Sequence, residues 1–213
     1  LGSLGDIYIN DAFSCSHRKQ ASIHNITKFV KNSYAGPLLK KEIDAINLVI
    51  QNKKEPVTCI IGGSKISTKI NVITNLIKKV DNLIIVGAMA NNFFVYKNFK
   101  VGKSLIEGNT SKIIKDIYKK AQESKCEVLI PEDCVVDTSF TGSGKNKDLN
   151  SIRDNEIILD IGLKTIKSIK HKIDQSNTVL WNGPAGYFEN KNFMTGTMSI
   201  AETISKNTIN KSL

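Results

Sequence analysis

The pattern of hydrophobic and polar positions predicts alternating strands and helices from residue 57 onward. Short apolar runs with the length of buried strands are VTCII (57–61), NLIIVG (82–87), EVLIP (127–131), IILDIG (157–162) and TVLWNG (178–183). Apolar residues at helical spacing lie between or after these runs, at Ile66, Ile70, Ile73, Ile77 and Val80, at Ile113, Ile114, Ile117 and Ala121, and at Ile166, Ile169 and Ile173. This alternation favours an α/β fold with a parallel sheet covered by helices on both faces.

The segment before residue 57 has a different pattern. The stretch AGPLLKKEIDAINLVIQ (35–51) carries apolar residues at helical spacing, and Pro37 stands near its first turn, where proline is tolerated. We therefore predict a long helix, which the polar stretch NKKEP (52–56) separates from the rest. Farther along, TGSGKNKD (141–148) is the clearest candidate for a surface loop.

Composition and charge change this picture little. The 213 residues are 40% hydrophobic and 23% charged, as in ordinary globular proteins. The net charge of +10 suits a nucleic-acid partner, but Arg18 and Arg153 are the only arginines and the lysines are scattered. We therefore interpret the positive charge as a solvated surface and expect no nucleic-acid partner.

The sequence offers no sign of a membrane span or a secretion signal. No apolar run approaches the roughly 20 residues of a spanning helix, and the first ten residues lack a basic-then-apolar layout. We expect a cytoplasmic protein with no membrane partner. The chain starts at Leu1 and stops at NTINKSL (207–213), inside a predicted helix, so we expect a fragment at both ends.

The cysteines and histidines predict neither disulfides nor a metal site. No CxxC pair occurs, and no spacing between cysteine and histidine suits zinc. Cys59 lies in an apolar run and is expected to behave as a small buried hydrophobic residue.

Three of the predicted strands end in glycine and other small residues. The segments are GGSK (62–65), GAMA (87–90) and NGPAG (182–186), and Phe188 and Glu189 follow the last one closely. Ligands of parallel α/β sheets bind beyond the carboxyl ends of the strands. Glycine lets the backbone approach a ligand there, and the N–H groups at helix starts suit phosphate. The sequence therefore predicts a phosphate-binding edge.

Two lysines, Lys65 at the end of the first of these segments and Lys69 four residues farther on, need an explanation. Lys65 and Lys69 would lie on one face of a helix beginning there, where they repel each other and oppose the helix dipole. A polyphosphate would relieve that repulsion, and Ser64 is a candidate N-cap. The alternative is that both side chains simply extend into water. The segment matches neither GxxxxGK[ST] nor GxGxxG.

The motifs YINDAFSCSHR (8–18), AGPLLKKEI (35–43), IIGGSKISTKI (60–70), VGAMANNF (86–93), LDIG (159–162) and TVLWNGPAGYFE (178–189) resemble the signatures of the phosphoglycerate kinase family. The resemblance extends from Gly5 to about Thr197. It implies a glycolytic enzyme that transfers a phosphoryl group between 1,3-bisphosphoglycerate and ADP, which gives 3-phosphoglycerate and Mg-ATP. Members of this family are typically monomers.

The resemblance also implies a division of the chain. Residues 1–35 would be the C-terminal part of a phosphoglycerate-binding α/β lobe, residues 36–53 the interdomain helix, and residues 54–213 an incomplete, Rossmann-like nucleotide-binding lobe. Most of the first lobe and a GGGDT segment, whose aspartate meets magnesium, are missing. We therefore expect the chain alone to be inactive, with the protein ligand of Mg²⁺ outside it and no metal-binding residue within it.

Residue roles follow from the same resemblance. Arg18 would bind the phosphoglycerate, and Lys65 and Lys69 would act in catalysis on the nucleotide phosphates and the transferring group. The nucleotide-binding set would comprise Ser64, Lys65, Lys69, Ala88, Asn182 and Glu189. Ala88 stands where the family usually has glycine, and Glu189 would accept hydrogen bonds from the ribose hydroxyls.

Several other polar residues invite a functional reading that we do not adopt. His17 is interpreted as structural, because transfer between anionic oxygens requires no general base. Asp6, Asp11 and Asp133 are expected to be caps or turn residues. Three alternatives stay open: a dinucleotide oxidoreductase, which would need GxGxxG, a nucleic-acid-binding module, and an inactive remnant.

Overall fold

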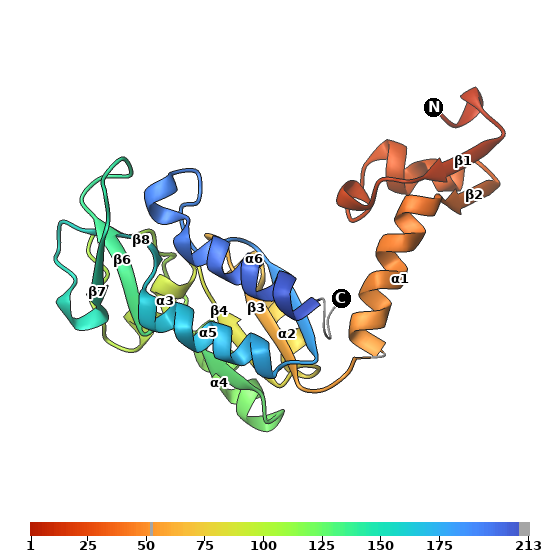
Figure 1. The fold of residues 1–213 in the computed structure, drawn as a ribbon. Coiled ribbons are helices and arrows are strands. Elements are labelled where there is room, and N and C mark those ends of the chain that lie inside the picture. The colour runs from red at the N-terminus through yellow and green to blue at the C-terminus, as the bar shows by residue number, and fades with distance from the viewer. Residues whose placement is uncertain (52, 209–213) are drawn as a thin grey trace. The chain divides into compact units, whose positions relative to one another are not determined.

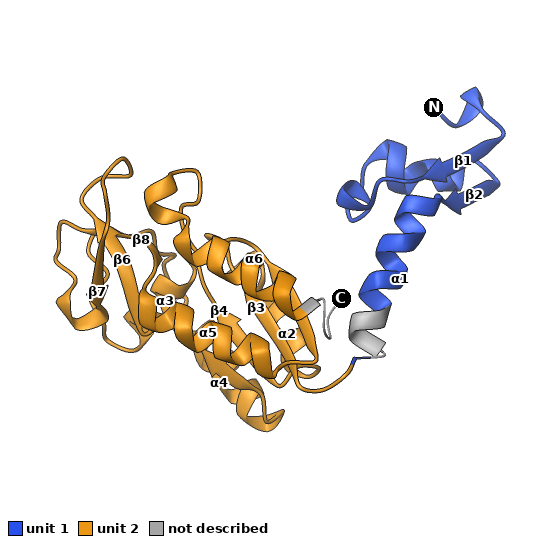
Figure 2. Cartoon of the chain, in the orientation of Figure 1, with its two compact units in different colours: residues 1–53 blue, residues 54–213 orange. Residues whose placement is uncertain are grey.

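The computed structural model describes residues 1–51 and 53–208, and the chain divides into two compact units, residues 1–53 and 54–213 (Figures 1 and 2). The division falls in the polar stretch that the hydrophobic pattern had marked.

The first unit holds a small parallel sheet and a long helix. Strand β1 (Ile7–Asn10) pairs with β2 (Asn32–Ala35), and short helical turns occupy much of the connection between them. Helix α1 (Pro37–Gln51) begins at the predicted proline. The backbone N–H of Leu39 donates to Asp11 Oδ1 at 2.8 Å, which satisfies one of the free donors of the first helical turn. Asp11 is therefore a cap, as predicted.

The second unit is built on a parallel sheet of four strands. These are β3 (Val57–Ile61), β4 (Asn82–Ile85), β5 (Glu127–Leu129) and β9 (Thr178–Asn182), in the order β5-β4-β3-β9. The helices of this unit are α2 (Ile70–Ile77), α3 (Ala90–Tyr96), α4 (Ser111–Glu123), α5 (Leu163–Gln175) and α6 (Thr195–Thr208). The predicted parallel α/β architecture is confirmed.

Helices cover both faces of this sheet, and the strands alternate between the two cores. Cys59 and Ile61 of β3 pack in one core with residues of α2, α3 and α4. Ile60 belongs to the other core, with residues of α5 and α6, which cross the front of the sheet in Figure 1. Because both faces are buried, β3 is an unbroken apolar run rather than an alternating one.

The run IILDIG forms β8 (Ile157–Ile161), but its place in the parallel sheet was predicted wrongly. It lies in a second sheet of order β7-β6-β8, antiparallel to β6 (Asp133–Asp137), which in turn pairs with β7 (Lys145–Asp148). The physical reason is that an apolar run reports burial and carries no information about the partner strand.

The prediction of a loop over residues 141–148 is also partly wrong, since its second half is strand β7. Lys145, Asn146 and Lys147 are polar, yet their backbone pairs with β6 at the edge of the second sheet. Charged side chains are common on such edges because they discourage pairing with other chains.

A buried carboxylate joins the second sheet to helix α5. Asp133 is fully buried and accepts hydrogen bonds from the backbone N–H groups of Lys164 and Thr165, at 3.0 and 2.9 Å, and from the Thr165 hydroxyl at 2.7 Å. These are donors of the first turn of α5, so Asp133 acts as a cap, as predicted.

Candidate functional site

The three glycine-containing turns meet at the carboxyl edge of the parallel sheet. The N–H of Gly62 donates to Asn182 O at 2.8 Å, the N–H of Met89 to Gly63 O at 2.9 Å, and the N–H of Gly87 to Ala185 O at 3.2 Å. The turns after β3, β4 and β9 are therefore hydrogen-bonded to one another.

The glycines in these turns are required by this close packing. A Cβ atom on Gly62 would lie 2.1 Å from the carbonyl oxygen of Pro184, and one on Gly183 would lie 2.6 Å from the carbonyl oxygen of Gly62. Gly87 has a φ of +69°, and its Cβ would lie 2.8 Å from Gly63 N. The structure thus gives these glycines a role in letting one turn approach another, while their predicted role in giving a ligand access to the backbone stays a prediction.

The predicted helical placement of the two lysines is wrong. Helix α2 begins only at Ile70, and residues 66–69 form a turn closed by the Lys69 N–H donating to Ile66 O at 3.0 Å. Lys69 is itself the N-cap residue, so Ser64 does not cap the helix. The lysines consequently do not share a helix face, although Lys69 still lies at the positive end of the α2 dipole.

Lys69 and Asn182 come together from distant parts of the chain. The Lys69 ammonium donates a hydrogen bond to Asn182 Oδ1 at the end of β9, and the Lys69 side chain passes close to Gly63. Lys65 is exposed on the same turn. Two of the residues predicted to bind a nucleotide are thus in direct contact.

The turn that carries both lysines is anchored from outside the sheet edge. Glu107 accepts hydrogen bonds from the Ser67 hydroxyl at 2.5 Å and from the Ser67 N–H at 3.1 Å. The Ser67 hydroxyl is the main cause that holds the pKa of Glu107 below its ordinary value. An ionised Glu107 therefore fixes the position of the 64–69 turn.

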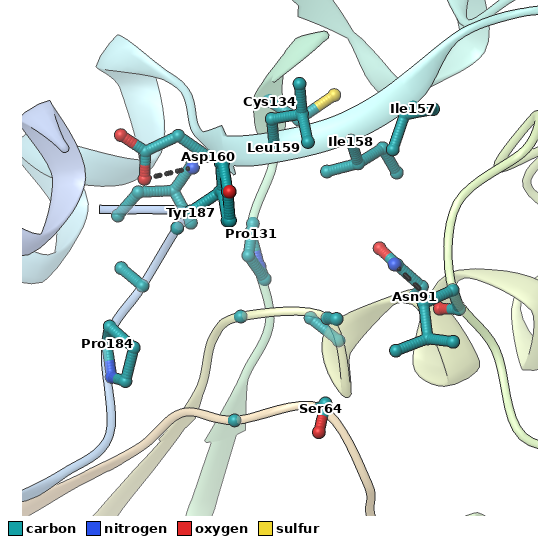
Figure 3. A pocket seen from close by; sticks show the side chains of 18 of the residues that line it. Ser64, Asn91, Pro131, Cys134, Ile157, Ile158, Leu159, Asp160, Pro184 and Tyr187 are labelled. Atoms are coloured by element: carbon teal, nitrogen blue, oxygen red, sulfur yellow. Dashed lines mark hydrogen bonds between the residues drawn. The ribbon is translucent and has the colours of Figure 1, made fainter. Parts of the chain in front are cut away.

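A pocket of about 590 Å³ opens at this edge of the sheet (Figure 3). Ser64, Ala88 and Glu189, three of the residues predicted to bind a nucleotide, line it together with Gly63 and Gly87. Much of the remaining wall is apolar, from Phe94, Leu105, Pro131, Ile157, Ile158, Leu159, Pro184 and Ala185. Among the described residues, Lys65, Lys69 and Asn182 lie outside this lining. A pocket with apolar walls and a few polar groups is typical of a small-molecule site.

Sequence analysis missed Asp160, which lies in the wall of this pocket. Its side chain accepts the N–H of Ile161 on Oδ1 and the N–H of Gly196 on Oδ2, each at 2.8 Å. Burial raises the pKa of Asp160 to about 6, against the opposing effect of these two hydrogen bonds. The LDIG motif contains this aspartate, but its spacing does not indicate that the side chain would be buried beside a pocket.

Sequence analysis also missed Asn91 and an aromatic pair in the lining. Asn91 comes from α3, and its side-chain amide donates to Leu105 O at 2.9 Å. Phe140 and Tyr187 pack edge to face, with ring centroids 5.2 Å apart. Asn91 and Tyr187 lie in the motifs VGAMANNF and TVLWNGPAGYFE, but neither motif indicates that these side chains line one pocket, because the segments that carry them meet only in the folded chain.

Arg18 belongs to the first unit, so its position relative to the pocket is not defined. Its side chain is exposed, and its backbone N–H donates to Cys15 O at 2.9 Å.

The described part of the chain has neither a metal-binding cluster nor a membrane-spanning helix. Residues 1–51 and 53–208 contain no group of three or more His, Cys, Asp and Glu side chains that could hold a metal ion. Within the same ranges, no helix is both long and apolar enough to cross a membrane.

A parallel sheet covered on both faces, with its pocket beyond the carboxyl ends of the strands, defines an α/β protein of the Rossmann-like class. Comparison with known proteins identifies the family. The model of the phosphoglycerate kinase family matches residues 1–212, and the chain belongs to that family.

Individual relatives agree with this assignment. The chain is 44% identical to the phosphoglycerate kinase of Wolbachia pipientis from Culex pipiens, over 96% of this chain and 52% of the relative. It is 41% identical to that of Xanthobacter flavus, again over 96% and 52%. The Coxiella burnetii phosphoglycerate kinase structure superposes with a TM-score of 0.85 at 35% identity, covering 96% of this chain and 53% of that one. The chain thus spans about half the length of the curated relatives it matches.

Proposed function

We propose that these residues belong to a phosphoglycerate kinase, which transfers a phosphoryl group between 1,3-bisphosphoglycerate and ADP to give 3-phosphoglycerate and ATP. Family membership supports the reaction class. The observation that carries the proposal is the apolar pocket beside the Lys69–Asn182 pair at the carboxyl edge of the sheet. There, a nucleotide could place its base in an apolar cavity and its phosphates near fixed cations.

In this proposal the pocket holds the base and ribose of the nucleotide. Glu189 lines the pocket and is exposed, so its carboxylate can accept hydrogen bonds from ribose hydroxyls. Ser64, in the turn after β3, and Ala88, in the turn after β4, form part of the pocket wall. The Ala88 methyl group makes the pocket slightly narrower than the glycine that is usual in the family would. Asn182 positions the Lys69 ammonium through their hydrogen bond.

Lys65 and Lys69 are proposed to act on the phosphates. Phosphoryl transfer passes through a transition state whose negative charge is spread over several oxygens, so cations that are already in place lower the barrier. The hydrogen bond to Asn182 holds Lys69, and the Ser67–Glu107 contact holds the turn that carries Lys65. The Lys69 ammonium and the backbone that carries Lys65 are therefore in place before the substrate binds.

The remaining parts of the proposal concern Mg²⁺, the second substrate and the state of the protein. The described residues offer no carboxylate cluster for Mg²⁺, so we assign no protein ligand and propose that the ion enters with the nucleotide. Arg18 is proposed to bind 3-phosphoglycerate or 1,3-bisphosphoglycerate, because its planar guanidinium pairs well with phosphate or carboxylate. A cytoplasmic monomer without nucleic-acid or membrane partners completes the proposal.

The test is a coupled assay of ATP formation with the protein that the complete reading frame encodes. Lys69→Ala is expected to lower kcat/KM about 30-fold or more, which corresponds to about 2 kcal/mol of transition-state stabilisation. Lys65→Ala should act in the same direction. Lys78→Ala removes an exposed lysine at the C-cap of α2, the opposite end of the helix from Lys69, and serves as the matched control. Equal activity of all three variants and the unmodified protein would refute the assigned roles.

A further inference from the structure

The loop of residues 97–110, which we call the α3–α4 loop, forms part of the pocket wall through Lys103 and Leu105. Between these two residues, the buried hydroxyl of Ser104 accepts the backbone N–H of Ile158 at 2.8 Å. Ile158 belongs to β8, so the second sheet holds the part of the loop that faces the pocket.

Two buried asparagines of α3 hold the next part of the same loop. Asn91 is 1% exposed, and its Nδ2 donates to Leu105 O at 2.9 Å (Figure 3). Its Oδ1 has no hydrogen-bond partner among the described residues, so this single bond is what Asn91 contributes. Asn92 is 2% exposed, and its Oδ1 accepts the backbone N–H of Glu107 at 2.8 Å. Because bonds between buried polar groups are costly to break, residues 105–107 are fixed to α3.

The side chain of Glu107 reaches from this fixed loop to the turn of residues 64–69, which we call the lysine turn. One carboxylate oxygen accepts the Ser67 hydroxyl at 2.5 Å, and the other accepts the Ser67 N–H at 3.1 Å. Ser67 stands midway between Lys65 and Lys69. Two bonds from an ionised carboxylate to one residue fix both the position and the orientation of the backbone there.

We propose that Glu107 is a positioning residue for phosphoryl transfer, which acts through Ser67 to hold the lysine turn in its working position. The inference rests on the proposed function and deepens it by joining two parts of the site. The α3–α4 loop contributes to the wall around the base and ribose, and through Glu107 it also sets the place of the cations that act on the phosphates. Affinity for the nucleotide and turnover should therefore be separable at this residue.

The negative charge of Glu107 offers a competing explanation for any effect of its removal. Lys65 is among the groups that lower the pKa of Glu107, so the carboxylate in turn reduces the positive potential at Lys65. Glu107→Gln separates the two effects. Its amide oxygen can accept the Ser67 N–H, and its amide NH₂ can donate to the Ser67 hydroxyl oxygen, so the contact remains while the charge is lost. Glu107→Ala loses both.

The test is the coupled assay of ATP formation with the protein that the complete reading frame encodes. Glu107→Ala is expected to lower kcat about tenfold and to leave the KM for ADP within about twofold, because a displaced catalytic group slows the chemical step while the pocket wall is still held by α3 and β8. Glu107→Gln should stay within about twofold of the unmodified protein in both constants. Glu123→Ala is the matched control, since this exposed carboxylate pairs with Lys119 on its own helix, and it should change neither constant.

Two further measurements show whether Glu107 acts through Ser67. Ser67→Ala removes one of the two bonds and should lower kcat about threefold, and the double variant should be no slower than Glu107→Ala alone, because both changes break one contact. Hydrogen exchange followed by mass spectrometry should be faster over residues 64–70 in Glu107→Ala and unchanged over β3 and β4. This second measurement reports on the lysine turn without depending on activity.

Each outcome supports or overturns the inference. Unchanged kcat in Glu107→Ala, alongside impaired Lys69→Ala, would overturn it and leave the proposed function standing. Equal losses in Glu107→Ala and Glu107→Gln would also overturn it, because the charge rather than the contact would then matter. A raised KM for ADP with unchanged kcat would show that Glu107 supports only the pocket. Full activity of Lys69→Ala would instead refute the proposed roles of the lysines, and the inference with them.

Discussion

The buried carboxyl group of Asp160 should make the stability of the second unit fall as the pH rises from about 4 to 6. In the folded chain burial raises the pKa of Asp160 to about 6, from an ordinary value of 3.8. Between these two values the folded chain binds more protons at this site than the unfolded chain does. Stability therefore decreases with rising pH in this window, and it levels off above pH 6.

The magnitude follows from the two pKa values. A difference of about 2 in pKa corresponds to about 3 kcal/mol over the whole window, at 1.36 kcal/mol for each pKa unit. Between pH 4.5 and pH 7 the contribution of Asp160 is about 2 kcal/mol, since part of the transition lies below pH 4.5. Other groups titrate in the same range, so the effect must be isolated by comparison with a variant.

The variant is Asp160→Asn, which cannot ionise. Urea unfolding at pH 4.5 and pH 7 can be followed by the fluorescence of Trp181, the single tryptophan, which lies in the second unit. The substitution also changes the overall stability, because the amide oxygen of asparagine can accept only one of the two backbone N–H groups now bound by the carboxylate, so the test compares only how the stability of each protein depends on pH. As the pH rises from 4.5 to 7, the free energy of unfolding of Asp160→Asn should increase by about 2 kcal/mol relative to that of the unmodified chain.

Asp116→Asn, which alters an exposed carboxyl group on α4, is the matched control. It should leave the pH dependence of the unmodified chain unchanged. If Asp160→Asn and the unmodified chain have parallel stability curves from pH 4.5 to 7, the carboxyl group does not titrate in this window and the reasoning from its burial is refuted.

Three further predictions follow from the site and the core. Gly62→Ala should destabilise the second unit by about 3 kcal/mol in thermal melts, because its Cβ would lie 2.1 Å from a backbone oxygen. Gly108→Ala is the control and should be nearly neutral, because the space around its Cβ is open. Glu189→Ala should weaken ADP binding by about 1 to 3 kcal/mol by calorimetry and leave 3-phosphoglycerate binding nearly intact, and an equal loss for both would indicate a folding defect. In native protein Cys15 should be the one thiol that reacts rapidly with Ellman's reagent. The other three thiols are buried, and burial raises their pKa values to about 12 for Cys59, about 11 for Cys126 and about 12 for Cys134. Rapid reaction of more than one thiol would contradict this prediction.

Much of the secondary structure was predictable because it depends on local patterns. The apolar runs at 57–61, 82–85 and 178–182 form strands of the parallel sheet, and the helical spacing around residues 113–121 and 166–173 lies within α4 and α5. Pro37 begins α1 as predicted, since its fixed φ suits a first helical turn. Such patterns record which face of an element is buried, and burial is a property that a short segment can encode.

The sequence also limited where a site could be. Glycines follow β3, β4 and β9, and the carboxyl ends of parallel strands must lie on one edge, so the three turns were predictable neighbours. Ser64, Ala88 and Glu189 indeed line one pocket there. Their roles in nucleotide binding stay predictions.

The tertiary structure alone decided which partner each element and polar group received. β8 has the apolar pattern of a parallel strand but pairs with β6, because the β6–β7 hairpin supplies an edge that no local pattern reveals. Lys69 contacts Asn182 across 113 positions, and Asp160 binds the backbone of Gly196 across 36. Hydrogen bonds and burial of this kind depend on groups that only folding brings together, so the unpaired oxygen of Asn91 and the raised pKa of Asp160 could not be read from the chain.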